Sequence, residues 1–245
     1  MPPRRLSVPD SAIVLAAGRG KRMGTLTNQT PKPLIRVEGR ALIDHVLDRL
    51  AAAGVKRAVV NLHYMGDAIA AHLAHRRDID IEFSRETAAL ETGGGVVKAL
   101  PLLGEFFYVL NADVFWLDGA TTALRQLAAG FDPARDDALL LMQPTARAAG
   151  YEGPGDFMLD PAGAVRRRRE TEIVPFVFAG IEIAQRRLFD AAPAGAFSIN
   201  RLWDRAIDGG RLRGLVHDGE WYHVGTPEGL ALADARIHHM HGIER

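Results

Sequence analysis

Short apolar runs recur along the first 143 residues of this chain, and segments with helical spacing lie between them. The five runs are AIVLAA at 12–17, AVVNL at 58–62, IDIEF at 79–83, FFYVL at 106–110 and ALLLM at 138–142. Unbroken rather than alternating apolar runs are typical of strands that are covered on both faces. Strands that alternate with helices therefore predict an α/β fold: a Rossmann-like, mostly parallel sheet with helices on both faces.

The first connecting helix can be placed between residues 42 and 53. Its apolar residues recur at helical spacing and end before Gly54, namely Leu42, Ile43, Val46, Leu47 and Leu50. One apolar face followed by a glycine is the pattern of a surface helix that ends in a left-handed cap. We expect this helix to cross over between the first two strands.

The pattern changes after residue 143, where glycine and proline divide the chain into short pieces. Such punctuation predicts loops and a small antiparallel elaboration of the sheet. Two helices follow. Ser198 is the expected cap of a helix that ends near Gly209. The second helix is expected to have Thr226 as its cap, Pro227 at its first position and Glu228 as the acidic residue of its first turn.

Composition narrows the class of protein. The chain has 245 residues, with 30 basic against 30 acidic, which excludes a nucleic-acid binder that acts through bulk positive charge. No apolar stretch approaches the roughly 20 residues that a membrane-spanning helix needs. Cysteine is absent, which excludes thiolate metal sites and a cysteine nucleophile and favours the cytoplasm. We expect a disordered leader over 1–10 and a single domain over 11–245, while the oligomeric state stays open.

A glycine-rich turn, LAAGRGKRM at 15–23, directly follows the first predicted strand. In open α/β sheets ligands bind beyond the carboxyl ends of strands, where glycines let backbone N–H groups approach phosphate oxygens. A tight turn that uses glycine only for its backbone freedom is the alternative. The turn predicts a triphosphate cradle that contains Leu15, Ala17, Gly18, Gly20, Lys21 and Arg22, with Arg19 adding positive charge.

Two further charged residues are candidates for contact with phosphates or a metal ion. Lys32 stands between Pro31 and Pro33, so we expect extended, rigid backbone that presents its ammonium group in a fixed position. Asp113 comes just after the strongly apolar run at 106–110, at the expected carboxyl end of a strand. A carboxylate beside phosphates is suited to Mg²⁺, and an aspartate that caps a turn or helix is the alternative.

These motifs together resemble the sugar-phosphate nucleotidyltransferases, whose signature is a strand followed by LAAGxGxRM, a Leu-Thr pair and PKPL. The matching residues here are 15–23, Leu26, Thr27 and 31–34. The stretch LETGGG at 90–95 looks like the branch of N-acetylmuramate α-1-phosphate uridylyltransferases, which serve cell-wall sugar recycling. Agreement continues at the Gly-Asp-Phe of 155–157, the FAGI of 178–181 and the VGT of 224–226.

The resemblance implies a reaction and a division of the chain. A nucleoside monophosphate, here UMP from UTP, would pass to a sugar 1-phosphate with release of pyrophosphate and with help from a divalent metal. The nucleotide half would span about 11–143 and the sugar-phosphate half about 144–245. No general base is needed, because a phosphate monoester is largely ionised at neutral pH.

The resemblance also implies roles for individual residues. Arg22 and the amides of the turn would neutralise pyrophosphate, Lys32 a reacting phosphate, and Asp113 would hold the metal. Thr92 and Gly93 would read the nucleobase, with Glu86 as a helper, although the glycines at 93–95 also fit a loop that needs positive φ. For the sugar we expect contacts in the irregular segment, at Gly155, Asp156 and Glu170, with Phe178 either an apolar wall or part of the core.

His223 departs from the family pattern, which commonly has a second metal-binding aspartate at this position. Imidazole suits Mn²⁺, Co²⁺ or Zn²⁺ better than the hard Mg²⁺ ion. Three roles are therefore open: His223 ligates a softer metal, holds a water in the metal's shell, or packs against Trp221 and Tyr222.

Two other functions stay open at this point. The same chemistry can act on another pair of substrates, such as GTP with mannose 1-phosphate, TTP with glucose 1-phosphate, or CTP with an aminoalcohol phosphate. A more distant alternative is a domain that senses nucleotide sugars without catalysis, suggested by His223; the retained Arg22, Lys32 and Asp113 favour an enzyme.

Overall fold

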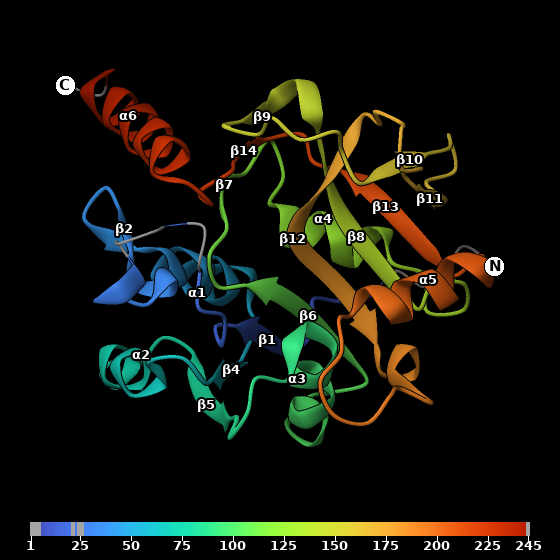
Figure 1. Cartoon of the computed structure of the whole chain (residues 1–245), viewed down its shortest axis with the longest axis horizontal. Helices are drawn as coiled ribbons and strands as arrows, with labels where there is room; N and C mark the ends of the chain where they lie inside the picture. Colours follow the sequence, from blue (N-terminus) through green and yellow to red (C-terminus); the bar gives the residue numbers. More distant parts are fainter. Residues whose placement is uncertain (1–5, 21–22, 24–26, 244–245) are drawn as a thin grey trace.

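A mixed sheet forms the centre of the computed structural model, which describes residues 6–20, 23 and 27–243, with side chains as far as residue 238 (Figure 1). Its strands run in the order β11-β10-β12-β6-β1-β4-β5, while β8 pairs with β12 and β13 with β8. The nine strands described are β1 (Ser11–Leu15), β4 (Arg57–Leu62), β5 (Asp80–Arg85), β6 (Phe106–Asn111), β8 (Ala138–Pro144), β10 (Phe157–Leu159), β11 (Val165–Arg167), β12 (Phe176–Gln185) and β13 (Leu212–Val216).

The five apolar runs coincide with β1, β4, β5, β6 and β8, which confirms the predicted strands and the α/β class. The parallel part of the sheet is β6-β1-β4-β5. Beyond β6 the sheet becomes mixed, because β12 runs against both β6 and β8, whereas β13 runs parallel to β8. The end of the parallel part therefore adjoins a strand from the later half of the chain.

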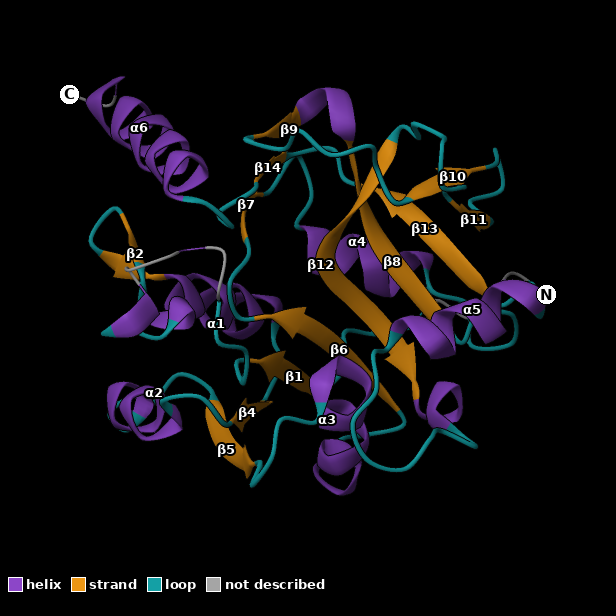
Figure 2. Ribbon diagram, in the orientation of Figure 1, coloured by secondary structure: helices purple, strands orange, loops and turns teal. Residues whose placement is uncertain are grey.

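Helices cover both faces of this sheet (Figure 2). One core cluster joins α1, α2 and α4 to side chains such as Val14, and a second joins α3 and α5 to side chains such as Ile13 on the opposite face. This confirms the two-sided cover that unbroken apolar strands predict. The α-helices described are α1 (Leu42–Ala53), α2 (Gly66–Leu73), α3 (Glu91–Ala99), α4 (Ala123–Gly130), α5 (Asn200–Asp208) and α6 (Pro227–Ile243).

The predicted ends of two helices are also found, whereas the cap expected at Ser198 lies one residue later. Gly54 has a φ of 98° and donates its N–H to carbonyl oxygens at the end of α1, as a left-handed cap does. Thr226 Oγ1 accepts from the N–H of Gly229 and caps α6. Before α5, Ser198 Oγ accepts from the N–H of Asn200, although the capping position itself is Ile199.

Smaller elements surround the sheet. Strands β10 and β11 form an antiparallel ribbon at its edge, as expected for the segment after residue 143. Strands β7 (Phe115–Leu117), β14 (Glu220–Tyr222) and β9 (Ala148–Ala149) make a second sheet, and β2 (Arg36–Val37) pairs with β3 (Arg40–Ala41). Short 3₁₀ helices occupy Lys32–Leu34, Leu100–Leu102, Thr145–Arg147 and Arg186–Phe189.

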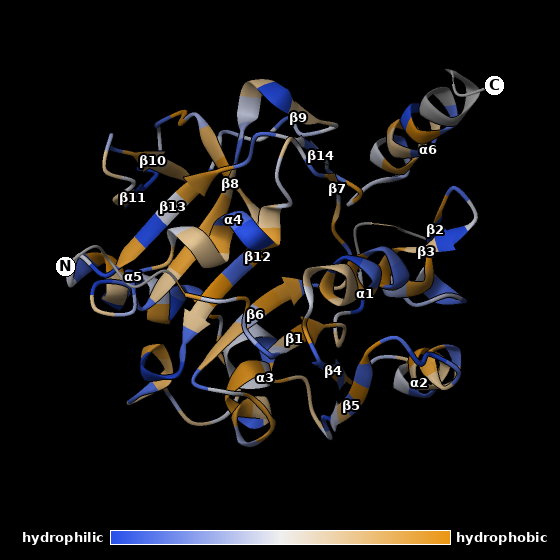
Figure 3. Cartoon of the chain, turned by 180° about the vertical axis from the view of Figure 1, so that it is seen from behind, coloured by the Kyte–Doolittle hydropathy of each residue, from blue (hydrophilic) through white to orange (hydrophobic). Residues whose placement is uncertain are grey.

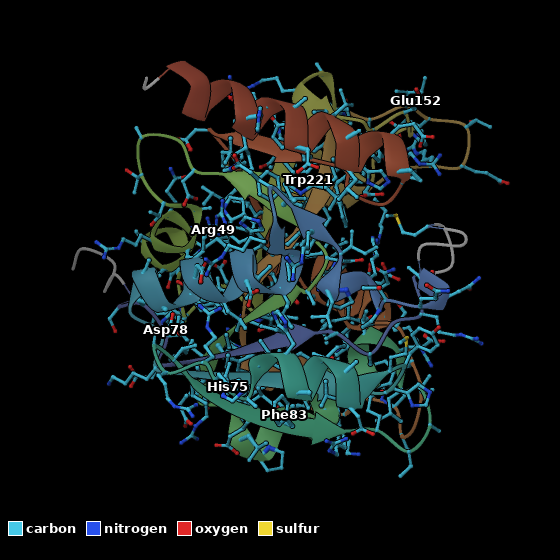
Figure 4. The ribbon with its side chains drawn as sticks, turned by 90° about the vertical axis from the view of Figure 1, so that its left-hand side faces the viewer. Arg49, His75, Asp78, Phe83, Glu152 and Trp221 are labelled. Carbon is cyan, nitrogen blue, oxygen red and sulfur yellow. The ribbon has the colours of Figure 1, made fainter. Side chains whose placement is uncertain are left out.

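The two ends of the described chain lie against different parts of the core. Of the leader expected over 1–10, residues 1–5 lie outside the described residues, whereas Leu6 and Val8 pack against the cluster beneath α1. Helix α6 packs through Ala233 and Ile237 on a third cluster, with Trp221 beneath it in Figure 4. In the described part of the chain, no helix is long and apolar enough to cross a membrane.

Candidate active site

Three adjoining cavities lie where the parallel strands end. The first, of about 420 Å³, is bordered by the glycine-rich turn and by Lys32, Thr92 and Asp113. The second, of about 260 Å³, and the third, of about 420 Å³, share Asp156 and Phe178, and the third also contains His223. Among the residues that the structure describes, Asn111 alone borders all three cavities and therefore marks their junction.

The register of the sheet brings these groups together. Leu15, the last residue of β1, pairs with Asn111, the last residue of β6, and the N–H of Ala112 donates to the carbonyl oxygen of Leu15 at 3.0 Å. The turn and Asp113 therefore leave the sheet side by side. This is the edge at which open α/β sheets bind ligands.

The glycine-rich turn lies against Lys32. Gly20 has a φ of 62°, and a Cβ on it would come 2.9 Å from the Cβ of Lys32, so both its backbone and its neighbour require glycine. Gly18 has open space on the corresponding side. Leu15, Ala17, Gly18, Arg19 and Gly20 all line the first cavity, as expected for a phosphate cradle. Lys21 and Arg22 lie outside the described residues.

Tyr64 supports this turn from the end of β4. Its ring lies 5.1 Å below the guanidinium carbon of Arg19, and its hydroxyl donates to the carbonyl oxygen of Thr27 at 3.0 Å. The prediction from sequence did not include Tyr64. Its two contacts attach Arg19 and Thr27 to the end of β4.

Lys32 and Asp113 form an ion pair at the border of the first and third cavities. The Nζ of Lys32 lies 2.6 Å from Oδ2 of Asp113, and Lys32 is only 7% exposed. The expectation of extended backbone at Lys32 is wrong: Pro31 is extended, and Lys32 begins a 3₁₀ helix. Hydrogen bonds from Leu34 N to Pro31 O and from Ile35 N to Lys32 O close that turn and outweigh the bias from the following proline.

Glu86 borders the first cavity, but both of its carboxylate oxygens are used within the protein. Oε1 accepts from Nδ2 of Asn61 at 2.7 Å, and Oε2 accepts from the N–H of Leu90 at 3.0 Å. Asn61 in turn accepts from the N–H of Ala16 through Oδ1. Glu86 is thus a residue that fixes the edge of the cavity, and its expected role as a helper in reading the base stays a prediction.

Residues 93–95 lie inside α3 rather than in a loop before it, and φ is not positive at any of them. A Cβ on Gly93 would come 2.2 Å from the ring of Phe197, and its N–H already donates to the carbonyl oxygen of Phe197 at 2.9 Å. Gly93 therefore serves packing, and its expected contact with the base stays a prediction. Thr92 borders the first two cavities, and its Oγ1 accepts from the N–H of Ile199.

The residues expected to contact the sugar separate into two groups. Asp156 borders the second and third cavities, and its Oδ2 accepts from the N–H of Phe178 at 3.0 Å. Phe178 is both cavity wall and core, since its ring meets that of Trp203 at 4.8 Å. Gly155 lies outside the three cavities in a turn with a φ of 80°, and Glu170 lies on an exposed loop after β11. The sugar contacts expected of these two residues stay predictions.

His223 lies in the third cavity with Lys32 and Asp113. Its ring centroid is 5.9 Å from those of Trp221 and Tyr151, whereas the ring of Tyr222 packs on Phe115. The packing expected beside Trp221 is therefore found, with Tyr151 in place of Tyr222. Its presence in the same cavity as Asp113 keeps the two metal-linked roles open.

Within the described ranges, no group of three or more histidine, cysteine, aspartate or glutamate residues is arranged to hold a metal ion. Mg²⁺ does not need such a cage, because it is commonly held by one or two carboxylates together with substrate phosphates and water. The Asp113 carboxylate, at the border of two cavities, fits that mode of binding.

Besides Tyr64, three polar side chains of the site were missed from sequence: Asn61, Asn111 and Glu182. Each is polar and occurs in or directly after an otherwise apolar strand. That pattern is the signal by which they could have been found, since a polar group is rarely buried in a strand without a partner or a ligand.

A parallel sheet that ends in a glycine-rich turn, beside a buried lysine paired with an aspartate, is the arrangement of a nucleotidyltransferase. Residues 12–216 match the MobA-like NTP transferase domain family, and the chain belongs to this family.

Individual relatives extend the match over nearly the whole chain. An N-acetylmuramate alpha-1-phosphate uridylyltransferase of Caulobacter vibrioides is 43% identical over 94% of this chain and 97% of its own length. A protein of the same name from Neisseria meningitidis serogroup B is 36% identical over 91% of this chain and 98% of its own. The crystal structure of HddC from Yersinia pseudotuberculosis complexed with GMP-PN shares the fold, with a TM-score of 0.75 at 19% identity over 93% of this chain and 99% of that chain.

Proposed function

We propose that this nucleotidyltransferase transfers UMP from UTP to a sugar 1-phosphate, N-acetylmuramate α-1-phosphate, and releases pyrophosphate. The two uridylyltransferases that match nearly the full chain support this choice of substrates. The observation that carries the proposal is the Lys32–Asp113 pair at the border of two cavities, beside Asn111 at the junction of all three. Two phosphorylated substrates that enter from different cavities would meet there.

The first cavity would hold UTP. The amides of the turn around Gly18 and Gly20 would face the triphosphate, and Thr92 would contact the nucleoside from the start of α3. The sugar would occupy the second cavity, with its phosphate directed toward the third. In this arrangement residues 11–143 form the nucleotide half and residues 144–245 the sugar-phosphate half.

Catalysis then depends on charge and position. Asp113 and the 3₁₀ helix hold the ammonium group of Lys32 in place, where it would neutralise a phosphate. A phosphate oxygen of the sugar 1-phosphate would then attack the α-phosphorus of UTP in line with the leaving pyrophosphate. Arg22 stays the proposed partner of pyrophosphate. No side chain needs to take a proton, because the attacking phosphate monoester is already ionised.

Asp113 would hold a divalent cation, Mg²⁺ by the hardness of the carboxylate, or Mn²⁺ or Co²⁺ if His223 also contributes. When bound, this cation would neutralise phosphate charge. The proposed compartment is the cytoplasm, and the proposed context is cell-wall sugar recycling.

The test is pyrophosphate release by the full chain with UTP, GTP, TTP and CTP, each combined with a panel of sugar 1-phosphates. We expect turnover with UTP and N-acetylmuramate α-1-phosphate to exceed every other pair. A higher rate with GTP and mannose 1-phosphate, or with TTP and glucose 1-phosphate, would keep the chemistry and overturn the proposed substrates. No pyrophosphate release from any pair would overturn the proposed function.

A further inference from the structure

Glu182 is a buried carboxyl group in the wall of the second cavity. It lies on β12, is fully buried, and pairs across the sheet with the apolar residues Val109 and Leu140. Its Oε2 accepts from the Nε1 of Trp203 at 2.9 Å, while its Oε1 has no hydrogen-bond partner among the described residues. A buried polar atom without a hydrogen-bond partner destabilises the folded protein unless a ligand supplies that partner.

The surroundings of Glu182 favour the neutral acid. Burial raises the pKa of Glu182 to about 8, and the hydrogen bond from Trp203 opposes this rise only in part. Since Trp203 donates to Oε2, the proton belongs on Oε1, which then becomes a hydrogen-bond donor. The acid therefore presents an O–H group that needs an acceptor.

The other charged groups of the cavity contact residues other than Glu182. Arg167 Nε lies 2.7 Å from Asp204 Oδ1, and Asp156 Oδ2 accepts from the N–H of Phe178. The strands on either side of β12 present only the apolar Val109 and Leu140 opposite Glu182. Among the described residues, none of the hydrogen bonds or ion pairs of Glu182 involves a cation, so its partner in a complex is expected to be uncharged.

Three aromatic side chains also line this cavity, and one of them, Trp203, contacts Glu182. They are Phe157, Phe178 and Trp203, and the ring of Trp203 meets those of Phe178 and Phe157 edge to face, with centroids 4.8 and 6.3 Å apart. A ligand group that fits here needs a hydrogen-bond acceptor for the acid and a small apolar part for the rings. An N-acyl group combines a carbonyl oxygen with a methyl group and meets both needs.

We propose that Glu182 determines specificity for N-acylated sugars, with its Oε1 donating a hydrogen bond to the acyl carbonyl oxygen while the acyl methyl packs on Phe178 and Trp203. This inference rests on the proposed function in one respect, since it assigns the sugar to the second cavity. Trp203 is the positioning residue, because it fixes which carboxyl oxygen faces the ligand.

The test compares the binding of N-acetylglucosamine 1-phosphate and glucose 1-phosphate, which differ only in the group on carbon 2, by calorimetry on the full chain. We expect the wild type to prefer the acetylated sugar by about tenfold, and Glu182→Leu to lose this preference, since a buried donor discriminates strongly between ligands with and without its acceptor. Glu182→Gln keeps a donor of the same shape and should keep the preference within about threefold.

Gln143→Leu is the matched control. Gln143 is also fully buried on the adjacent strand β8 and also has an oxygen without a partner among the described residues, but it lies outside the three cavities. Its substitution should leave the preference for the acetylated sugar unchanged. If Gln143→Leu loses the preference to a comparable extent, the effect comes from general loosening of the protein core, and the role of Glu182 is overturned.

A pH series supplies the second measurement if the leucine variant does not fold. The wild type should lose its preference as pH rises from about 7 to about 9, because ionised Glu182 has no proton to donate, whereas Glu182→Gln should keep it. Equal pH dependence of the two proteins, no preference in the wild type, or a retained preference in Glu182→Leu would each overturn the inference. Pyrophosphate release, measured separately, shows whether the proposed function fails on its own.

Discussion

Replacing Glu182 with glutamine should make the free energy of unfolding less dependent on pH. The pKa of Glu182 is raised from 4.5 to about 8 by burial, so between these values the folded protein keeps a proton that the unfolded chain loses. Stability from this group is fully present below about pH 4.5 and is lost as pH rises toward 8. Glutamine does not titrate and does not share this loss.

The size of the effect follows from the shift. At about 1.4 kcal/mol for each pKa unit, the move from 4.5 to about 8 corresponds to about 5 kcal/mol for a single fully buried group. A domain of this kind is stable by about 5 to 15 kcal/mol in total, so the effect is large enough to measure. The advantage of Glu182→Gln over the wild type should therefore grow by about 1.4 kcal/mol for each pH unit up to about 8.

Urea unfolding followed by circular dichroism at several values between about pH 5 and about pH 9 measures this difference. The control is Gln143→Leu, which changes a buried polar group on the neighbouring strand that does not titrate and should shift stability equally at every pH. If the curves of Glu182→Gln and the wild type stay parallel to within about 1 kcal/mol across the range, the reasoning from burial is wrong.

Other substitutions test the remaining parts of the site. Lys32→Ala should lower kcat/KM by about 100-fold or more with an unchanged fold by circular dichroism, and Lys32→Arg should not restore it; an alanine variant within about threefold of the wild type would refute its role. Asp113→Asn should abolish Mg²⁺-dependent pyrophosphate release while leaving UTP binding in EDTA unchanged, and full activity at saturating Mg²⁺ would refute the assigned metal contact. His223→Asp should shift the metal preference from Mn²⁺ toward Mg²⁺, whereas identical metal titrations would leave the histidine with packing alone. The pKa of Glu220 is lowered to about 2, first of all by its hydrogen bond from Arg236. The free energy of unfolding of Glu220→Gln should therefore be lower than that of the wild type at about pH 7, and the difference should vanish as pH falls toward 2.

The parallel half of the fold could be predicted because each strand is a local apolar run with a helix after it. Strand β12 could not be placed in the same way. Its ten residues contain Gly180, Glu182 and Gln185, and β12 carries a hydrophilic stretch in Figure 3. Its partners, β6 and β8, come from far earlier in the chain, and its pairing with β8 is irregular between Phe178 and Glu182. Only these long-range contacts make the segment a central strand.

The site follows the same division. Lys32 and Asp113 were predictable because each has a local signal, two flanking prolines in one case and the end of an apolar run in the other. The glycines of α3 gave a misleading signal, since Phe197, about one hundred residues later, is what excludes a side chain at Gly93. No window of sequence around residue 93 contains that information.

The contact between the starts of α3 and α5 limits how relatives of this protein can be recombined. Thr92 accepts from the N–H of Ile199, and Gly93 receives the ring of Phe197 where any Cβ would stand. A chimera that takes residues 90–95 from one parent and residues 197–203 from another would have to reproduce this fit by chance. To transfer a new sugar specificity to this chain, both segments must therefore be taken together from one parent, although they lie in different halves of the sequence.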